Sequence, residues 1–126
     1  MILVDSTKYI SWMRQGRNPV AILAPQVTAG ELLNCGIVRV EVLRGVLKLR
    51  VKTELTHFFN IVPEVPLTAT LLNNAANLAW SLDRQGKILP VTDIIIAACA
   101  QLAKAELITE DLHFQKIPNL KVRAEL

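Results

Sequence analysis

Apolar residues along the chain fall into two kinds of segment. Short, continuous apolar runs are typical of strands that are buried on both faces of a sheet. Longer segments, in which apolar residues recur every three or four positions, are typical of amphipathic helices. We predict strands at residues 1–4, 32–38 and 106–109, with a last strand within residues 120–126.

Helical segments are predicted between those strands. The clearest is residues 68–85, where an apolar stripe at helical spacing ends before Gly86. Another, residues 92–105, is apolar on several sides after Asp93, as expected of a helix buried in a core. The others are residues 6–16 with Gly16 as the stop, residues 37–48 beyond the second strand, and residues 52–59.

Strands that alternate with helices favour a parallel sheet covered on both faces. We therefore predict an α/β fold, a three-layer α/β/α sandwich with a mostly parallel central sheet, in a single domain over residues 1–126. Hydrophobic residues make up 52% of the chain and charged residues 20%, a composition that argues against disorder. Aromatic residues are only 5%, so the core is aliphatic, and a module that stacks bases on aromatic rings is disfavoured.

Two further properties of the sequence indicate a cytoplasmic protein with no membrane segment. The longest apolar run near Asp93 is residues 94–100, far short of the roughly 20 residues that span a bilayer. The N-terminal residues, MILVDSTKY, lack the basic start and long apolar run of a signal peptide. Cys35 and Cys99 lie among apolar neighbours without CxxC spacing, which predicts reduced, buried thiols.

The formal net charge of +3 is compatible with a polyanionic partner, but it does not specify one. The basic side chains are spread along the chain, with one modest cluster in residues 44–52. A solvated helix face explains this cluster equally well.

Four acidic residues lie where parallel sheets commonly build their sites, beyond the carboxyl ends of the strands. Asp5 closes the first predicted strand, and Asp111 follows the strand that contains Leu107. Glu41 lies on the helix after the second strand, and Asp93 begins a buried helix. We therefore expect these four carboxylates to converge on one edge of the sheet.

Each acid also has an ordinary structural explanation. Thr92 or Asp93 could cap a helix, and Glu41 could be a surface acid paired with Arg39 or Arg44. The two remaining acids could lie in a helix cap and in a turn. The joint placement of the four acids favours a common site more than any one of them does.

The segments around these acids resemble, in order and spacing, the four acidic blocks of PIN domains. The segments are ILVDSTKYI, IVRVEVLRG, VTDIIIAACA and LITEDLHFQKI. The most specific parts are the acid-x-x-x-Gly pattern of Glu41 and Gly45, and the Asp-apolar-apolar-apolar-Ala-Ala pattern from Asp93. The likeness covers nearly the whole chain and is strongest to the small VapC-type toxins of toxin–antitoxin pairs.

This resemblance implies a PIN-like fold and a Mg²⁺-dependent endoribonuclease that leaves a 5′-phosphate and a 3′-hydroxyl. The implied catalytic and metal-binding residues are Asp5, Glu41, Asp93 and Asp111, supported by Thr109 and Ser6. Two assignments stay open, because Thr7 competes with Ser6 and Glu110 competes with Asp111.

The chemistry of clustered carboxylates fits that expectation. Without a cation the carboxylates repel one another and their pKa values rise. Mg²⁺ prefers oxygen ligands and retains several waters, and Mn²⁺ accepts the same ligands. Zinc is less expected, because neither His57 nor His113 matches one of the acidic blocks.

The resemblance also implies partners. These are an RNA substrate, a second copy of the chain in a homodimer, and a VapB-type antitoxin whose C-terminal segment wraps the toxin. A basic residue of the antitoxin would enter the acidic pocket. The chain has no DNA-reading motif of its own, so direct sequence-specific DNA binding is not expected.

Several alternatives remain open. A PIN nuclease could process RNA outside a toxin–antitoxin pair, or the fold could be a catalytically inactive binding module. An apolar contact surface for such a module could include Tyr9, Trp12, Met13 and Trp80, although core packing is expected for each. A metal-independent ribonuclease would need His57 and His113 as its acid and base. Phosphatase, receiver and P-loop motifs are missing.

Overall fold

The computed structural model describes residues 1–126, the whole chain. Its strands are β1 (Ile2–Val4), β2 (Leu32–Cys35), β3 (Glu64–Val65), β4 (Glu106–Ile108) and β5 (Val122–Arg123). Its α-helices are α1 (Ser6–Arg14), α2 (Pro19–Thr28), α3 (Gly36–Arg44), α4 (Leu49–Ile61), α5 (Ala69–Arg84) and α6 (Val91–Leu102). A 3₁₀-helix, η1 (Leu112–Lys116), follows β4.

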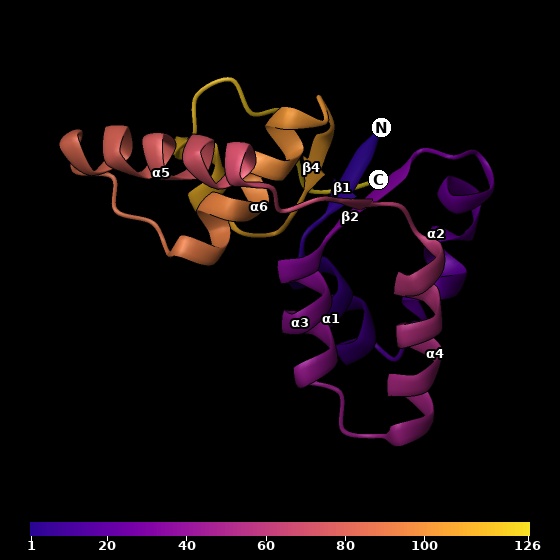
Figure 1. Cartoon of the computed structure of the whole chain (residues 1–126). Coiled ribbons are helices and arrows are strands. Elements are labelled where there is room, and N and C mark those ends of the chain that lie inside the picture. Colours follow the sequence, from indigo (N-terminus) through magenta and orange to yellow (C-terminus); the bar gives the residue numbers. More distant parts are fainter.

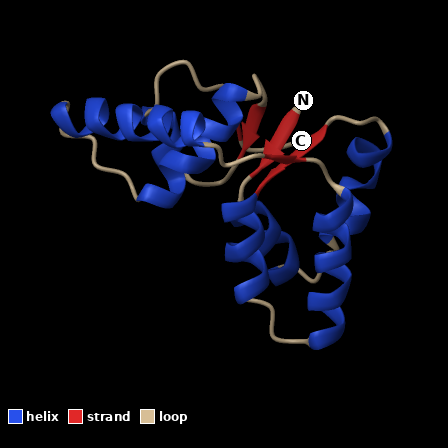
Figure 2. Ribbon diagram, viewed as in Figure 1, coloured by secondary structure: helices blue, strands red, loops and turns tan.

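The five strands form one sheet in the order β3-β2-β1-β4-β5, and every neighbouring pair is parallel. Ile2 of β1 lies opposite Leu32 of β2 on one side and Glu106 of β4 on the other. The strands β2 and β3 lie on one side of β1, and the later strands β4 and β5 lie on the other. The strand order therefore reverses direction at β1, and its carboxyl end is the switch point of the sheet. Figure 2 shows the strands together between the helices.

The helices lie in two groups. Figure 1 shows α5 and α6 on one side of the strands and α1 to α4 on the other. Between them lies one core of 29 buried residues, which is mainly aliphatic and includes Leu3 and Leu107 at 0% exposure. The predicted three-layer sandwich with a parallel sheet is therefore confirmed.

Small residues allow α6 to pack closely into this core. Ala97, Ala98 and Ala100 are buried together with Ile94 and Ile96, and α6 packs against α5, α3 and β4. A helix that is apolar on most sides is stable only when neighbouring elements cover it. The first turn of α6 is less buried than the rest of the helix.

The predicted strand over residues 32–38 was too long. β2 ends at Cys35, and Gly36 already begins α3. The apolar run continues past Cys35 because Val38 is buried on α3. A short apolar run does not distinguish a strand from a buried helical segment, so the predicted strand included the start of this helix. The helix predicted to reach residue 48 ends at Arg44, where Gly45 is the C-cap.

Other boundaries also moved. The helix predicted at 52–59 extends over Leu49–Ile61, and the one predicted at 92–105 ends at Leu102. Lys104 adopts a left-handed φ of 53°, which ends helical geometry before β4. The last strand predicted within residues 120–126 is β5.

Three elements were not predicted, namely α2, β3 and η1. Helix α2 contains Pro25, a residue that normally interrupts helices. Its N-terminus nevertheless carries a recognisable signal, because Asn18 accepts a hydrogen bond from the Val20 N–H at 3.0 Å and Pro19 occupies the first turn. Strand β3 lies between Pro63 and Pro66 at the sheet edge, where prolines are tolerated.

Cys35 and Cys99 are free, buried and 3.4 Å apart at their sulfur atoms, as expected for reduced thiols. Among the residues considered for an apolar surface, Tyr9 and Trp12 are core residues at 1% and 3% exposure. Trp80 is 61% exposed on α5, with the Arg84 guanidinium 4.8 Å from its ring centroid. The expectation that Trp80 packs into the core was therefore wrong.

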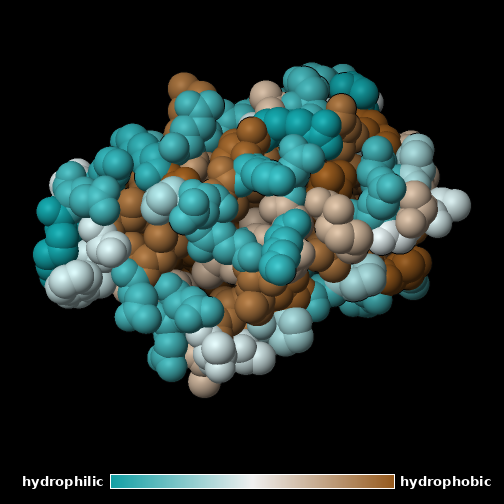
Figure 3. All heavy atoms as spheres, turned by 90° about the horizontal axis from the view of Figure 1, so that it is seen from above, coloured by the Kyte–Doolittle hydropathy of each residue, from teal (hydrophilic) through white to brown (hydrophobic).

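The outside of the molecule is mixed in character. In the view from above, hydrophilic residues cover much of the face and hydrophobic residues show between them (Figure 3). The basic side chains of residues 44–52 are exposed, as a solvated helix face requires. Every helix is too short or too polar to cross a membrane.

Candidate active site

Asp5 lies at the switch point of the sheet and is 2% exposed. It follows β1 directly, and its backbone N–H donates to the Ile108 carbonyl oxygen of β4 at 2.9 Å. Asp5 is the N-cap residue of α1, but its side chain accepts no capping hydrogen bond. Its carboxylate is therefore available for other contacts.

Two hydroxyl groups bind one oxygen of this carboxylate. Thr7 Oγ1 and Thr109 Oγ1 each donate to Asp5 Oδ2 at 2.8 Å. The second oxygen, Oδ1, makes no hydrogen bond within the chain, and it is not among the fully buried polar atoms that lack a partner. Asp5 is thus held in one orientation by neutral donors, with Oδ1 left free.

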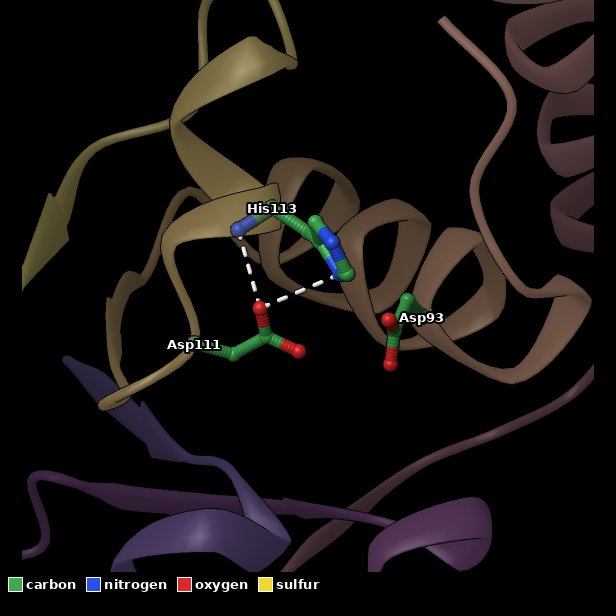
Figure 4. Close-up of side chains that lie close together, drawn as sticks. All are labelled: Asp93, Asp111 and His113. Carbon is green, nitrogen blue, oxygen red and sulfur yellow. Dashed lines mark hydrogen bonds and ion pairs between the residues drawn. The ribbon is translucent and has the colours of Figure 1, made fainter.

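Asp111 is positioned by the loop that follows β4. Its backbone N–H donates to Thr109 Oγ1 at 3.0 Å. Its Oδ1 accepts the backbone N–H of His113 at 2.9 Å, which caps η1, and lies 3.2 Å from His113 Nδ1. Figure 4 shows both contacts.

Asp93 lies on α6, which is on the other side of the strands from α1 and α3. It lies in the first turn of α6, where Pro90 is the N-cap residue and no side chain caps the helix. In Figure 4 its carboxylate lies beside Asp111 and His113, and one ligand atom from each of the three residues lies within 4.8 Å of the others. The capping role considered for Thr92 or Asp93 is therefore wrong.

Glu41 reaches the site from α3. Ser6 Oγ, at the start of α1, donates to Glu41 Oε1 at 3.2 Å. Of the two basic residues considered as partners for Glu41, Arg39 instead contacts Glu64 at 3.1 Å. Arg44 lies near enough to lower the pKa of Glu41, but it forms no ion pair with it.

The pKa values show that the acids affect one another. The pKa of Asp93 is raised to about 6, first by burial and then by the negative charges of Asp111, Asp5 and Glu41, while His113 opposes the shift. Burial also raises the pKa of Glu41, the Ser6 hydrogen bond lowers it, and the charge of Asp5 raises it. The four predicted acids thus lie within electrostatic reach of one another.

Glu110 and Asp111 have different surroundings. Glu110 Oε1 lies 3.3 Å from Lys8 Nζ, and its side chain is 44% exposed. Lys8 is almost fully buried and also lies 3.6 Å from Glu125 Oε1. The lysine therefore neutralises Glu110, while Asp111 lies beside Asp93.

The two histidines are in different places. His57 is exposed on α4, which lies well away from β4 and the segment after it in Figure 1. His113 lies against Asp111 and Asp93. The histidine pair required by the metal-independent alternative is therefore not brought together.

Lys8 was missing from the residues expected in the site, the role of His113 was underestimated, and Thr7 was expected only as an alternative to Ser6. Thr7 contacts Asp5, whereas Ser6 contacts Glu41, so both candidates for one supporting position are in the site. Lys8 gave no signal, because a lysine in an amphipathic segment normally points to solvent. His113 was considered only as a flanking residue, although its position two residues after Asp111 is typical of a turn that brings both side chains together.

The donor set fits a hard divalent cation. Burial and the charges of Asp111, Asp5 and Glu41 raise the pKa of Asp93, and burial and the charge of Asp5 raise the pKa of Glu41, a condition that a bound cation would relieve. Carboxylate oxygens predominate, as Mg²⁺ and Mn²⁺ prefer, and the His113 imidazole is one nitrogen at the rim. Asp93, Asp111 and His113 have ligand atoms close enough together to hold such an ion, and the carboxylates of Asp5 and Glu41 lie near enough for their charges to act on Asp93.

Comparison with known proteins identifies related folds. The chain is similar to one in VapBC2 from Rickettsia felis bound to a promoter DNA fragment, with 22% identity, coverage of 98% of both chains and a TM-score of 0.79. A chain of DNA-bound VapBC from Salmonella typhimurium has 16% identity, 98% coverage of both chains and a TM-score of 0.79. For a toxin–antitoxin complex from Klebsiella pneumoniae the values are 24%, 100% of both chains and 0.66.

At these identities the likeness is one of fold. No curated protein matches the sequence. The profile of the PIN domain matches residues 2–120, almost the whole chain. The chain therefore belongs to the PIN domain family.

Proposed function

We propose that this chain is a Mg²⁺-dependent endoribonuclease and the toxin of a VapBC-type toxin–antitoxin pair, acting in the cytoplasm. PIN domains are generally nucleases, and the similar folds include several toxin–antitoxin complexes. The observation that carries the proposal is the meeting of Asp93 with Asp111 and His113, whose ligand atoms lie within 4.8 Å of one another, at a place where burial and the charges of Asp111, Asp5 and Glu41 raise the pKa of Asp93. Such a cluster is costly unless a cation or protons balance it.

The proposed ion ligands are Asp5, Glu41 and Asp93. Asp111 completes a second metal position or orients the attacking water. Bound Mg²⁺ would acidify that water and stabilise negative charge on the phosphoryl group. Mn²⁺ is expected to substitute for it.

The remaining residues hold these ligands in place. Thr109 and Thr7 fix one oxygen of Asp5, and Ser6 fixes one oxygen of Glu41. Rigid placement matters because the reacting groups must be aligned before the transition state is reached. Hydrolysis of RNA would leave a 5′-phosphate and a 3′-hydroxyl.

Partners follow from the same proposal. The acidic site would accept a basic side chain from the C-terminal segment of a VapB-type antitoxin, since a guanidinium or ammonium group pairs well with clustered carboxylates. The active toxin would be a homodimer. DNA contacts of the complex would come from the antitoxin.

The decisive assay is cleavage of total RNA by the purified chain in Mg²⁺. Asp93→Asn is expected to abolish cleavage, and Asp83→Asn, a matched change at an exposed residue of α5, is expected to preserve it. EDTA should stop the wild-type reaction, and Mn²⁺ should restore it. Full activity in EDTA, or in folded Asp93→Asn, would contradict the proposal.

A second experiment separates a toxin from an RNA-processing nuclease or an inactive binding module. Induced expression of the wild-type chain should arrest growth, and Asp5→Asn should not. Coexpression with a short protein encoded immediately upstream should relieve the arrest. Cleavage in vitro without growth arrest would favour the processing role.

A further inference from the structure

An open pocket of about 630 Å³ adjoins the acidic site. Thr7 and Asp111 line the end that belongs to the site, and the rest is lined by Ser11, Arg14, Gln15, Glu110 and one apolar residue, Ile10. The volume lies within the range of about 300–1,000 Å³ that is usual for small-ligand sites. Most of the lining side chains are polar, so this is a place for a polar ligand.

Helix α1 forms one wall of this pocket. Thr7, Ser11 and Arg14 follow one another at intervals of four and three residues, which places them on one face of the helix. Thr7 contacts the catalytic carboxylate of Asp5, and Arg14 lies in the last turn. Seven positions along an α-helix span about 10 Å, so the face connects the acidic site to a point one or two nucleotides away.

The charges along the pocket suit an anion at the far end. Glu110 would repel an anion, but Lys8 lies 3.3 Å from its carboxylate and offsets its charge. Arg14 is exposed and makes no ion pair within the chain. Its guanidinium is therefore free to bind an external anion.

Hydroxyl and amide groups add to this end of the pocket. Gln15 Nε2 donates to Ser11 Oγ at 3.1 Å, so the Ser11 hydroxyl accepts a bond and retains its own proton for donation. A guanidinium with an adjacent hydroxyl donor matches the oxygen atoms of a phosphate. A carboxylate also presents two anionic oxygens, so the choice of a phosphodiester rests on the proposed ribonuclease site that the pocket adjoins.

We infer that this pocket is a subsite for the RNA backbone, in which Arg14 and Ser11 bind the phosphate of a nucleotide next to the cleaved bond. The inference rests on the proposed ribonuclease function and adds a named substrate contact to it. Arg14 is a binding residue here, and the acids carry the chemistry. Removing the Arg14 side chain should weaken substrate binding and leave the rate at which bound RNA is cleaved nearly unchanged.

The test compares Arg14→Gln with Arg17→Gln, which removes the same charge from a nearby exposed position outside the pocket. Binding of fluorescein-labelled oligouridylate is measured by anisotropy in the non-cleaving Asp93→Asn background over a series of salt concentrations. Arg14→Gln is expected to weaken binding about tenfold and to reduce the salt slope by about 0.7, the value for one phosphate contact on a single strand. Arg17→Gln should change neither quantity appreciably.

Kinetics and substrate length give an independent readout. In the cleaving protein, Arg14→Gln should raise KM with kcat nearly unchanged. A cleaved RNA is shortened one nucleotide at a time from one end, and its affinity is measured at each length. The wild type should lose affinity when the nucleotide whose phosphate contacts Arg14 is removed, and Arg14→Gln should show no loss at that length. Arg14→Lys should recover part of the affinity, since it restores the charge without the planar fork.

The outcomes separate the subsite from the proposed function. If the wild type cleaves RNA but Arg14→Gln binds like Arg17→Gln, the subsite is wrong and the ribonuclease proposal stands. If the wild type neither cleaves nor binds RNA, both are wrong. If an oligoglutamate peptide binds through Arg14 while RNA binding does not depend on it, the pocket serves a protein ligand and the inference is overturned.

Discussion

Asp5 is held by two threonine hydroxyls on a single oxygen, with no basic residue beside it. A lysine or arginine in that place would neutralise the carboxylate and compete with a metal ion. Neutral donors fix the orientation and leave the negative charge in place. The arrangement favours a carboxylate that is prepared for a cation.

Thr109→Val tests this support directly. The valine has a similar shape but cannot donate to Asp5, and the Asp111 N–H loses its acceptor. We expect a loss of about 1–3 kcal/mol in the free energy of unfolding, together with weaker Mg²⁺-dependent cleavage. Thr109→Ser keeps the hydroxyl and should retain most of both. Equal activity of the valine and serine variants would argue against the role of this hydrogen bond.

Asp93 has a pH-dependent effect on stability whose sign follows from its raised pKa of about 6. Between the ordinary value of 3.8 and about 6, the folded chain keeps a proton that the unfolded chain releases. Stability of the metal-free protein therefore falls as pH rises through that window. The loss remains in full at higher pH.

Asp93→Asn should remove this loss. In EDTA at about pH 8, the variant should be more stable than the wild type by about 1 kcal/mol, a value discounted for partial solvent exposure. Near pH 3.5 the difference should be small, because both chains are then neutral at this position. Thermal denaturation at the two pH values provides the measurement. A variant less stable than the wild type at pH 8 would contradict the electrostatic account.

The positions of Asp5, Asp93 and Asp111 were predictable, because these residues follow strand ends or begin a helix, whereas Glu41 lies within α3. Lys8 was not predicted, and the contacts of Thr7 and His113 were not either, since these depend on side-chain direction and on the path of the loop after β4. A sequence pattern fixes where an element ends more securely than it fixes which rotamer a side chain adopts. The ion pair between Lys8 and Glu110 supports Asp111 over Glu110 as the site residue, and that choice stays a prediction.

At the scale of elements, Lys8 connects three segments of the chain. It lies on α1, pairs with Glu110 after β4, and reaches Glu125 beyond β5. Its ammonium nitrogen also lies 5.4 Å from the centroid of the Trp12 ring. A buried charge with such partners is more informative about the placement of segments than about net stability.

Lys8→Met should keep the buried volume and remove these connections. We expect faster backbone amide exchange at residues 110–111 and 122–125, measured by hydrogen–deuterium exchange, with little change in the sheet core. Lys52→Met, at an exposed position of α4, is the matched control. Unchanged exchange in both regions would show that Lys8 does not hold them.

Element types were predicted better than their ends. Continuous apolar runs identified β1 and β4, but the run beginning at Leu32 combined a strand with the start of α3. The missed α2 has the Asn18-Pro19 start of a helix, which Pro25 obscures. The two-residue strands β3 and β5 form by pairing with β2 and β4. These pairings cannot be read from the short sequence of either strand alone.

At the scale of the whole molecule, alternation of strands and helices was sufficient to predict the layered architecture. The order of the strands was not predictable from periodicity, because it depends on the side of β1 on which each later strand joins the sheet. That order is what places β1 and β4 side by side and brings Asp5 to Thr109. The pairing of β1 with β4 therefore determines both the fold and the position of the site.

Metal binding should stabilise the whole fold, because the site joins both groups of helices and is formed only when the chain is folded. Mg²⁺ at ten times its dissociation constant is expected to add about 1.4 kcal/mol to the free energy of unfolding. Asp93→Asn should gain much less. Thermal denaturation with and without Mg²⁺ measures this, and an equal gain in both proteins would indicate binding elsewhere.

The proposed function requires above all that acids from distant parts of the chain share one cation. Diffraction from crystals soaked in Mn²⁺, recorded with its anomalous signal, tests this claim most directly. We predict a peak among the carboxylates of Asp5, Glu41, Asp93 and Asp111. A peak bound by other residues, or none where Mn²⁺ supports cleavage in solution, would contradict it.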